Sequence, residues 1–259
     1  MYLVKLLFCG PLLACFLLVG CTHSYDPKRA DEAIAKAEAF LRARTSFPPG
    51  ELAVVDYIGR KFHLAWANAR IAAVDVNQFA SDPWNDFSRL LKPDFLPPRE
   101  DIFNRAGTID GMSLTALYCD KYGLPGDYNS VLEKGFAGDD YWPTHTALAV
   151  GWAAENNCIV PKEYEQLRPT IRDAILRTIT RHSQVDDIFA ESIALLYYSG
   201  LRQDVQIAWL AKLVNAQLSD GGWSAEPFPM KSNSHTTVLA LWGLLEARNP
   251  NAPRIKWVR

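Results

Sequence analysis

Four strongly apolar segments recur in this chain, and their repetition constrains the fold more than any other feature. Each contains a similar tripeptide, beginning at Thr115, Thr146, Ser192 and Thr236. The spacings between these positions are about 31, 46 and 44 residues, within the range of proteins built from repeated pairs of helices. Residues 236–245 are apolar around most of a helix, so this segment has to be buried on nearly every side.

The segments between these repeats have a different pattern, a single apolar stripe at helical spacing. Residues 161–182 carry such a stripe, which includes Tyr164 and Ile171, and residues 205–218 carry another. Buried helices that alternate with striped helices predict an inner ring of helices wrapped by an outer ring. We therefore expect an all-α protein with the architecture of an α/α toroid, complete or partial, formed by one domain over residues 21–259.

Local signals place further helices before the repeats. Asp26, followed by proline, predicts an N-cap that opens a helix ending near Arg44. Residues 52–79 form a second long helical stretch, which we expect to be bent or broken, and residues 81–91 form a short one. A proline-rich connector follows, with Pro93, Pro97 and Pro98.

The first 20 residues have the zones of a signal peptide. Lys5 precedes an apolar run over residues 6–19, which is shorter than the roughly 20 residues that a membrane-spanning helix needs. The closing tetrapeptide Leu18-Val19-Gly20-Cys21 resembles the bacterial lipobox. That resemblance implies cleavage before Cys21 and lipidation of this cysteine, with palmitate among its acyl chains. An ordinary signal peptide or an uncleaved anchor is the alternative.

This resemblance also predicts a location. A lipoprotein contacts the membrane through its N-terminal lipid, and two or more acyl chains make a stable anchor. Thr22 stands where an aspartate would favour retention at the inner membrane, so we expect the outer membrane, facing the periplasm. After the signal peptide there is no second apolar run of about 18 residues, so we expect the mature body to be soluble.

Charge and cysteine content narrow the classes of partner and compartment. The formal net charge is −2 and no run of Lys and Arg occurs, so a nucleic-acid partner is not expected. Cys119 and Cys158 remain in the mature chain. An oxidising periplasm would permit a disulfide between them, but we favour two buried thiols, because small buried cysteines are equally common.

One stretch carries a family pattern. Residues 217–224 read Gln-Leu-Ser-Asp-Gly-Gly-Trp-Ser, and residues 234–242 begin the last apolar helix. The pair resembles the repeat of terpenoid cyclases and protein prenyltransferases, in which Q-x-x-DGGW closes an outer helix before an inner helix begins. Residues 139–142 look like a degenerate copy. The resemblance covers about the last 45 residues and implies the toroid fold, with no activity attached to it.

Several motifs of related toroids are missing. The D-x-D-D acid of hopene cyclases, the DDxxD diphosphate motif and the C-G-E-Q thioester do not occur. His235 matches the position of a zinc-binding histidine in prenyltransferases, but the paired D-x-C ligands have no counterpart. We therefore expect no metal and no other cofactor.

The inner helices of a toroid all start at one end, so polar groups near these starts should converge at one mouth. The candidates are Asp110, Asp139, Asp140, His145, Asp186, Asp187, Glu191, Asp220 and His235. Aspartates at helix starts are commonly caps, which is the interpretation we favour for Asp110, Asp186 and Asp220. His145 and His235 recur at matching repeat positions, and we favour a structural role slightly over a functional one for both.

The remaining candidates include a carboxylate pair. Glu191 lies one helical turn beyond Asp187, so both side chains can face the central cavity and act as acid and base. A solvated pair at a helix start is the alternative, and the one we favour. Four tryptophans could stack on a sugar or a prenyl chain, but such spacing is more typical of core residues: Trp142, Trp152, Trp223 and Trp242.

Two functional hypotheses follow. The first is a lipid-anchored toroid that binds an envelope glycan, lipid or protein without catalysis, because no catalytic motif is complete. The second is an envelope enzyme that acts on a polysaccharide or a polyprenyl-linked substrate, with catalytic residues Asp187, Glu191, His145 and His235. A central cavity filled by tryptophan and leucine would favour the first hypothesis. An acid–base pair around an open pocket would favour the second.

Overall fold

The described part of the chain is mostly helical, which confirms the expectation of an all-α protein. The computed structural model describes residues 25–259 except 227 and 229, so the predicted signal peptide and Cys21 lie outside the described residues. Two short antiparallel strands, β1 (Trp223–Ser224) and β2 (Ser232–Asn233), form a hairpin. Within the described ranges, no helix is both long and apolar enough to cross a bilayer.

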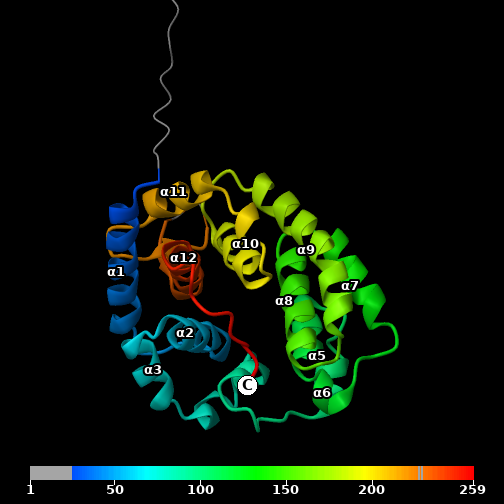
Figure 1. The fold of residues 1–259 in the computed structure, drawn as a ribbon. Coiled ribbons are helices and arrows are strands. Elements are labelled where there is room, and N and C mark those ends of the chain that lie inside the picture. Colours follow the sequence, from blue (N-terminus) through cyan, green and yellow to red (C-terminus); the bar gives the residue numbers. More distant parts are fainter. Residues whose placement is uncertain (1–24, 227, 229) are drawn as a thin grey trace, which may run out of the picture.

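Five helices surround the middle of the molecule (Figure 1). They are α2 (Pro49–Phe62), α5 (Ile109–Leu117), α8 (Trp142–Glu155), α10 (Asp187–Tyr198) and α12 (Ser234–Arg248). Helix α5 packs against α8, α8 against α10, α10 against α12, and α12 against α2. Four of these inner helices contain the repeated tripeptides, and nearly every residue of α10 and α12 is buried. Helix α2 joins them without the tripeptide.

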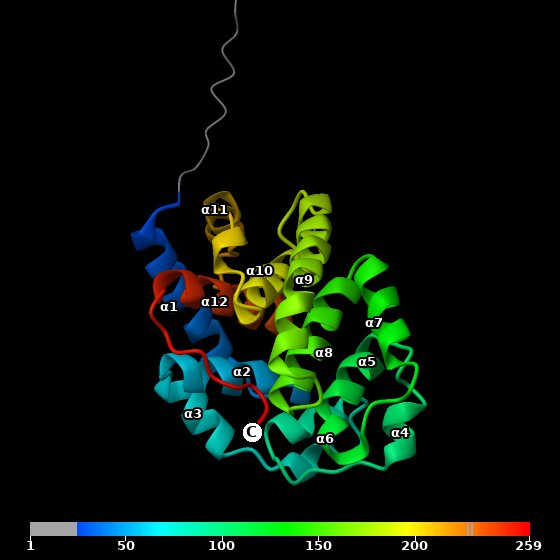
Figure 2. The ribbon, with the colours of Figure 1, turned by 45° about the vertical axis from the view of Figure 1, so that its right-hand side comes forward.

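Other helices lie outside this inner layer, as Figure 1 and Figure 2 show. They are α1 (Pro27–Ala43), α7 (Tyr128–Ala137), α9 (Pro161–Arg181) and α11 (Ile207–Ala216). Helices α1 and α11 pack against α12, α9 packs against α8 and α10, and α7 packs against α8. Along the chain, helices buried on all sides thus alternate with helices that bury one stripe.

Shorter elements connect the two layers. The stretch expected to be bent or broken is divided at His63, whose positive φ of 56° separates α2 from α3 (Ala65–Ala72). The short helix expected over residues 81–91 is a 3-10 helix, η2 (Asn85–Leu90), which packs against α2. The remaining short helices are η1 (Val76–Phe79), α4 (Arg99–Phe103), α6 (Cys119–Tyr122) and η3 (Arg202–Asp204).

The glycine-rich turn after α11 connects the outer helices to α12, since Trp223 N donates to Thr237 Oγ1 at 3.0 Å. Gly221 has a φ of 93°, and a Cβ atom there would lie 2.5 Å from the backbone oxygen of Lys36 in α1, so the position requires glycine. The Asp220 carboxylate accepts a hydrogen bond from Gly222 N at 3.1 Å. Trp223 is buried and donates from Nε1 to Leu213 O at 2.8 Å, so its ring ties the turn to α11.

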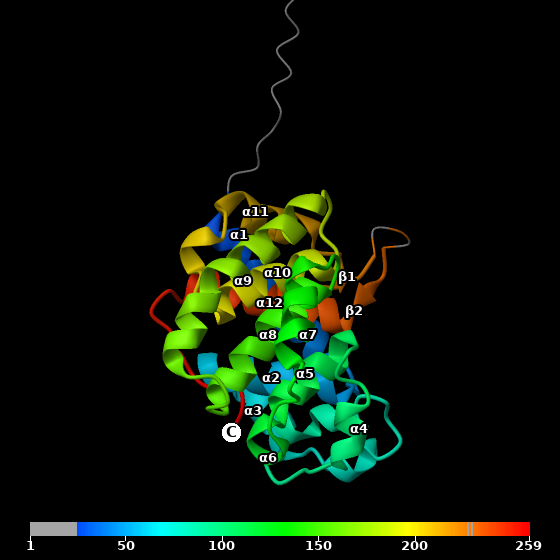
Figure 3. The ribbon, with the colours of Figure 1, turned by 90° about the vertical axis from the view of Figure 1, so that its right-hand side faces the viewer.

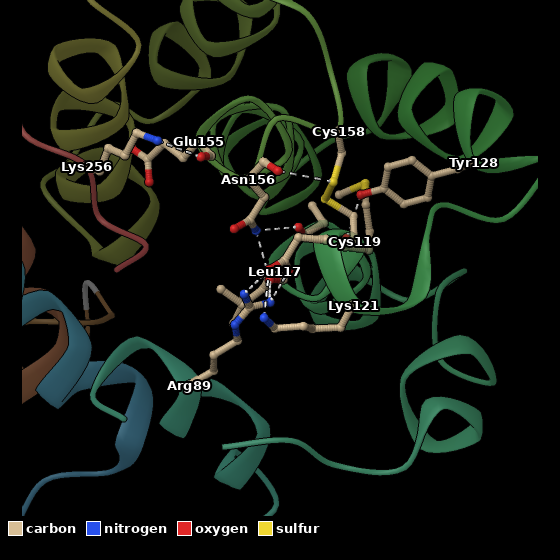
Figure 4. The surroundings of a disulfide bond; sticks show 12 residues. Arg89, Leu117, Cys119, Lys121, Tyr128, Glu155, Asn156, Cys158 and Lys256 are labelled. Atoms are coloured by element: carbon tan, nitrogen blue, oxygen red, sulfur yellow. Dashed lines mark hydrogen bonds and ion pairs between the residues drawn. A yellow bond between two sulfur atoms is a disulfide. The ribbon is translucent and has the colours of Figure 1, made fainter. Parts of the chain in front are cut away.

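Cys119 and Cys158 form a disulfide, so the expectation of two buried thiols is wrong (Figure 4). The local backbone explains the bond. Helix α8 ends at Glu155, and the positive φ of 60° at Asn157 turns the chain back toward α6. The Asn156 amide donates to Leu117 O at 2.9 Å, and the Cα atoms of the two cysteines lie 6.2 Å apart, which is within disulfide range.

Candidate functional site

The amino-terminal turns of all five inner helices meet at one cavity of about 420 Å³. Each helix contributes ionisable side chains within its first five residues: Glu51 from α2, Asp110 from α5, His145 from α8, Asp187 and Glu191 from α10, and His235 from α12. The four residues predicted as catalytic therefore line a single cavity. Because the helix dipoles point their positive ends at it, they favour the carboxylates that the helices themselves gather here.

Four of the aspartates expected at the mouth do not line this cavity. Asp139 and Asp140 are exposed, and Asp139 pairs with Arg181. Asp186 caps α10, as expected, by accepting from Phe189 N at 2.8 Å. Asp220 holds the glycine-rich turn described above and is a turn cap rather than a helix cap.

Two further expectations concern capping and the histidines. Asp110 is not the cap of α5, because Thr108 Oγ1 accepts from Gly111 N at 3.1 Å and leaves Asp110 facing the cavity. His182, for which the sequence suggested no partner, contacts the Asp186 carboxylate at 2.6 Å. Neither His182 nor Asp186 lines the cavity.

The Asp187 carboxylate is the most heavily bonded group of the site. It is 5% exposed and accepts from Tyr141 Oη at 2.9 Å and from Thr236 Oγ1. His235 Nδ1 lies 3.1 Å from each of its oxygens. Burial alone would raise the pKa of this carboxyl, but the hydrogen bond and charge of His235, together with the two hydroxyl donors, lower it. Asp187 is therefore ionised at neutral pH.

His235 is the partner of this carboxylate and faces the cavity. Asn233 is the N-cap of α12 and accepts from His235 N at 2.8 Å, so the imidazole itself is not a cap. Burial would lower the pKa of His235, but the hydrogen bond and charge of Asp187 outweigh it and raise the pKa to about 9. The side chain is 38% exposed, so a cationic imidazole borders the cavity at neutral pH.

Glu191 lies in a different environment, although it is one helical turn from Asp187. It is 4% exposed, and its Oε2 has no hydrogen-bond partner among the described residues. Burial raises the pKa of Glu191 to about 7, which the positive charge of His235 only partly offsets. Two neighbouring carboxyl groups thus have opposite protonation preferences, and Glu191 can exchange a proton near neutral pH.

His145 lies between two carboxyl groups. Its Nε2 is 3.7 Å from Glu191 Oε1, and its Nδ1 is 3.7 Å from Asp110 Oδ1. Burial, reinforced by the charge of His235, lowers the pKa of His145 to about 4, so the imidazole is neutral at pH 7. Ser113 Oγ lies 3.3 Å from Nδ1. A neutral imidazole in this position can carry a proton to or from Glu191.

Aromatic rings form another part of the cavity wall. Trp84, Phe87, Trp152 and Trp257 line it. Of the four tryptophans expected in the core, Trp152, Trp223 and Trp242 are buried, whereas Trp142 is only half-buried. The Trp152 Nε1 donor and Glu51 Oε2 have no hydrogen-bond partner among the described residues. Together with Glu191, three side chains from three helices that line the same cavity each have a buried polar atom without a partner among the described residues, which is a feature of a ligand site.

Sequence reasoning missed Glu51, Tyr141 and Trp257 as members of this site. Glu51 lies in the third position of α2, and α2 lacks the tripeptide that marks the other inner helices. Tyr141 directly precedes α8, and its place in the degenerate turn was the one available signal. Trp257 follows the last helix and has no periodic neighbour.

No group of three or more His, Cys, Asp or Glu side chains within the described ranges has the geometry to hold a metal ion. Comparisons with known proteins found no family model, no curated protein and no solved structure that matches this chain.

Proposed function

We propose that this cavity is the catalytic site of an enzyme that processes a glycan of the cell envelope. The observation that carries the proposal is the contrast between two carboxyl groups one helical turn apart. Asp187 has a lowered pKa and Glu191 a pKa raised to about 7 in the same cavity. A carboxyl group that is half protonated near neutral pH is suited to general acid catalysis.

Each polar residue has a distinct role in this proposal. Glu191 donates a proton to the glycosidic oxygen as its bond to the anomeric carbon breaks, and a water molecule attacks that carbon. Neutral His145 accepts the proton that the water releases and passes it back to Glu191. His235 touches the substrate as a cation and donates a hydrogen bond to a sugar hydroxyl. Asp187 is a positioning residue, because its oxygens are occupied by Tyr141, Thr236 and His235.

The charge of the cavity favours a glycan over a polyprenyl phosphate. Four carboxyl groups line it, from Glu51, Asp110, Asp187 and Glu191, against one cationic side chain, His235. A phosphate group would be repelled by this excess of acid, whereas sugar hydroxyls donate hydrogen bonds to carboxylates. Aromatic rings such as Trp152 offer apolar faces on which a sugar ring can stack.

The helical arrangement supports a second proposal, which concerns the fold. We infer that the inner and outer helices form a partial α/α toroid of the terpenoid cyclase type. The alternating layers, the common end at which the inner helices start, and the turn around Gly221 and Trp223 are the supporting observations.

We further propose that the protein is an outer-membrane lipoprotein anchored through Cys21, with its body in the periplasm. The lipobox-like tetrapeptide supports the anchor. The Cys119–Cys158 disulfide supports an oxidising compartment, because such bonds are rare in the cytosol.

Screening of the full mature protein in detergent tests the enzymatic proposal. The probes are peptidoglycan strands, N-acetylglucosamine oligomers and polyprenyl phosphates. We expect new reducing ends from a glycan probe, no change in the phosphates, and loss of turnover with retained binding in Glu191→Gln. The control is Glu165→Gln on the outer helix α9, where the side chain is 56% exposed. Binding without turnover in the unchanged protein would instead support a binding domain.

A further inference from the structure

The chain after α12 runs without helix or strand from residue 249 to 259 and passes the carboxyl ends of α2 and α8. Figure 1 shows this C-terminal tail in red, crossing from α12 toward α2 and η2. Figure 3 shows that the tail and the β1–β2 hairpin, which leads into the start of α12, lie on opposite sides. The tail therefore lies at the end of the inner layer remote from the ionisable cluster.

Trp257 is the part of the tail that enters the protein. It is 3% exposed, and its Nε1 donates to Ala53 O at 3.1 Å. Its ring centroid lies 5.0 Å from that of Tyr57, 5.3 Å from that of Trp242 and 5.5 Å from that of Trp152. Since Trp257 also lines the cavity, its indole forms the inner end of the space that the ionisable groups open on the other side.

Hydrogen bonds hold the tail in one position. Glu155, the last residue of α8, accepts from Trp257 N at 2.9 Å and from Val258 N at 2.8 Å through Oε2. Arg60 of α2 donates to Lys256 O at 2.9 Å and to Trp257 O at 3.0 Å. The tail is thus tied to two inner helices at once, and these bonds immobilise the indole of Trp257.

We propose that Trp257 closes the cavity at one end and so restricts the site to the end of a glycan chain. This inference rests on the proposed glycan substrate and specifies how that substrate is taken. A through-channel would let a polymer pass along the axis of the inner helices. A space of about 420 Å³, closed by an indole at one end, holds a small ligand or a chain terminus and leaves the rest of the polymer outside.

The test measures how affinity depends on chain length. The probes are N-acetylglucosamine oligomers of one to six units, titrated calorimetrically into the full mature protein and its variants, all carrying Glu191→Gln so that the oligomers bind without turnover. For the unchanged protein we expect affinity to rise over the first units and then to stop rising. In Trp257→Ala we expect the rise to continue for at least one more unit, with a gain of about threefold or more for that oligomer, equivalent to less than 1 kcal/mol.

Three further variants keep the result interpretable. Trp257→Phe retains an aromatic ring at the closed end and should restore the limit seen in the unchanged protein. Trp209→Ala removes another buried tryptophan, on α11 and outside the cavity lining, and should leave the limit unchanged. Trp257→Leu serves as the open variant if Trp257→Ala does not fold.

The possible outcomes separate the two proposals. If affinity in the unchanged protein rises through all six units, or if the open variant keeps the original limit, the closed-end inference is wrong while the glycan proposal stands. An equal shift in Trp209→Ala also overturns the inference, because it would reflect a general loss of packing. If no oligomer binds the unchanged protein, the glycan proposal and the inference fail together.

Discussion

His235 Nδ1 lies 3.1 Å from both oxygens of Asp187, which joins the first turn of α12 to the first turn of α10. A buried carboxylate here holds the proton of an imidazole that faces a cavity. The charge of His235 at neutral pH therefore depends on a residue from a neighbouring helix.

Replacing Asp187 by asparagine should remove this dependence. In Asp187→Asn, burial acts on His235 against the charges of Glu191 and Glu51 alone, so the imidazole pKa should fall well below 9. Titration of the imidazole protons by NMR measures the change. Asp186→Asn is the matched control, since the adjacent Asp186 contacts His182 instead. An unchanged His235 pKa in Asp187→Asn would contradict the assigned pairing.

The same pair should make stability fall at alkaline pH. The folded-state pKa of His235 is raised above its ordinary 6.5, so its stabilising contribution is complete below pH 6.5. The contribution is lost as pH rises toward 9, and Asp187→Asn should show a smaller loss across that range.

Glu191 should affect stability at lower pH. Because its pKa is raised from 4.5 to about 7, the folded protein keeps a proton that the unfolded chain releases. The contribution of Glu191 to the free energy of unfolding should then fall between pH 4.5 and 7, by on the order of 3 kcal/mol. Glu191→Gln should show a smaller fall in denaturant titrations at pH 5 and pH 8. The exposed control Glu165→Gln should keep the full fall in the free energy of unfolding. If Glu191→Gln shows a fall as large as that of this control, Glu191 does not cause the pH dependence.

The most deeply buried helices could be anticipated from the sequence because burial on all sides leaves a compositional trace. Helices α5, α8, α10 and α12 share that trace. Because these helices were expected to start at the same end, the sequence also predicted that Asp187, Glu191, His145 and His235 lie close together, and all four line one cavity. Helix α2 was predicted to be helical but not to belong to the inner layer, because its buried face includes charged residues such as Asp56 and Lys61, whose ion pairs become visible only in three dimensions.

The sequence could not reveal the chemical asymmetry of the site. The spacing of Asp187 and Glu191 is the same whether one carboxyl is bonded to three donors or both are solvated. The contrast comes from Tyr141, Thr236 and His235, which approach Asp187 from α12 and from the turn before α8 and leave Glu191 Oε2 without a partner among the described residues. The Cys119–Cys158 disulfide was likewise missed, because it depends on a single left-handed residue, Asn157.

Loss of the disulfide should destabilise the protein substantially. The bond joins residues 39 positions apart, and closing a loop of that size restricts the unfolded chain. The double variant Cys119→Ser, Cys158→Ser should lower the free energy of unfolding by about 2–4 kcal/mol in urea titrations. Reducing agent should destabilise the unchanged protein by a similar amount and leave the double variant unaffected. Equal sensitivity of both proteins to reductant would contradict the bond.

Membrane anchoring should depend on the thiol of Cys21, which is the predicted lipidation site. Cys21→Ser should abolish incorporation of labelled palmitate and leave an unprocessed precursor or no acylated mature protein. Cys158→Ser should still be labelled. Label in the Cys21→Ser protein, or a native mature chain that begins at another residue, would contradict the lipoprotein proposal.

The pH dependence of glycan turnover tests most directly whether Glu191 is the proton donor. A general acid must be protonated to act, so kcat/KM for the glycan probe should be highest below pH 7 and fall tenfold per unit above the Glu191 pKa of about 7. The account predicts that this falling limb is absent in Glu191→Gln, together with most of the turnover. A rate that is constant through pH 8, or a Glu191→Gln variant with the turnover and pH profile of the unchanged protein, would contradict it.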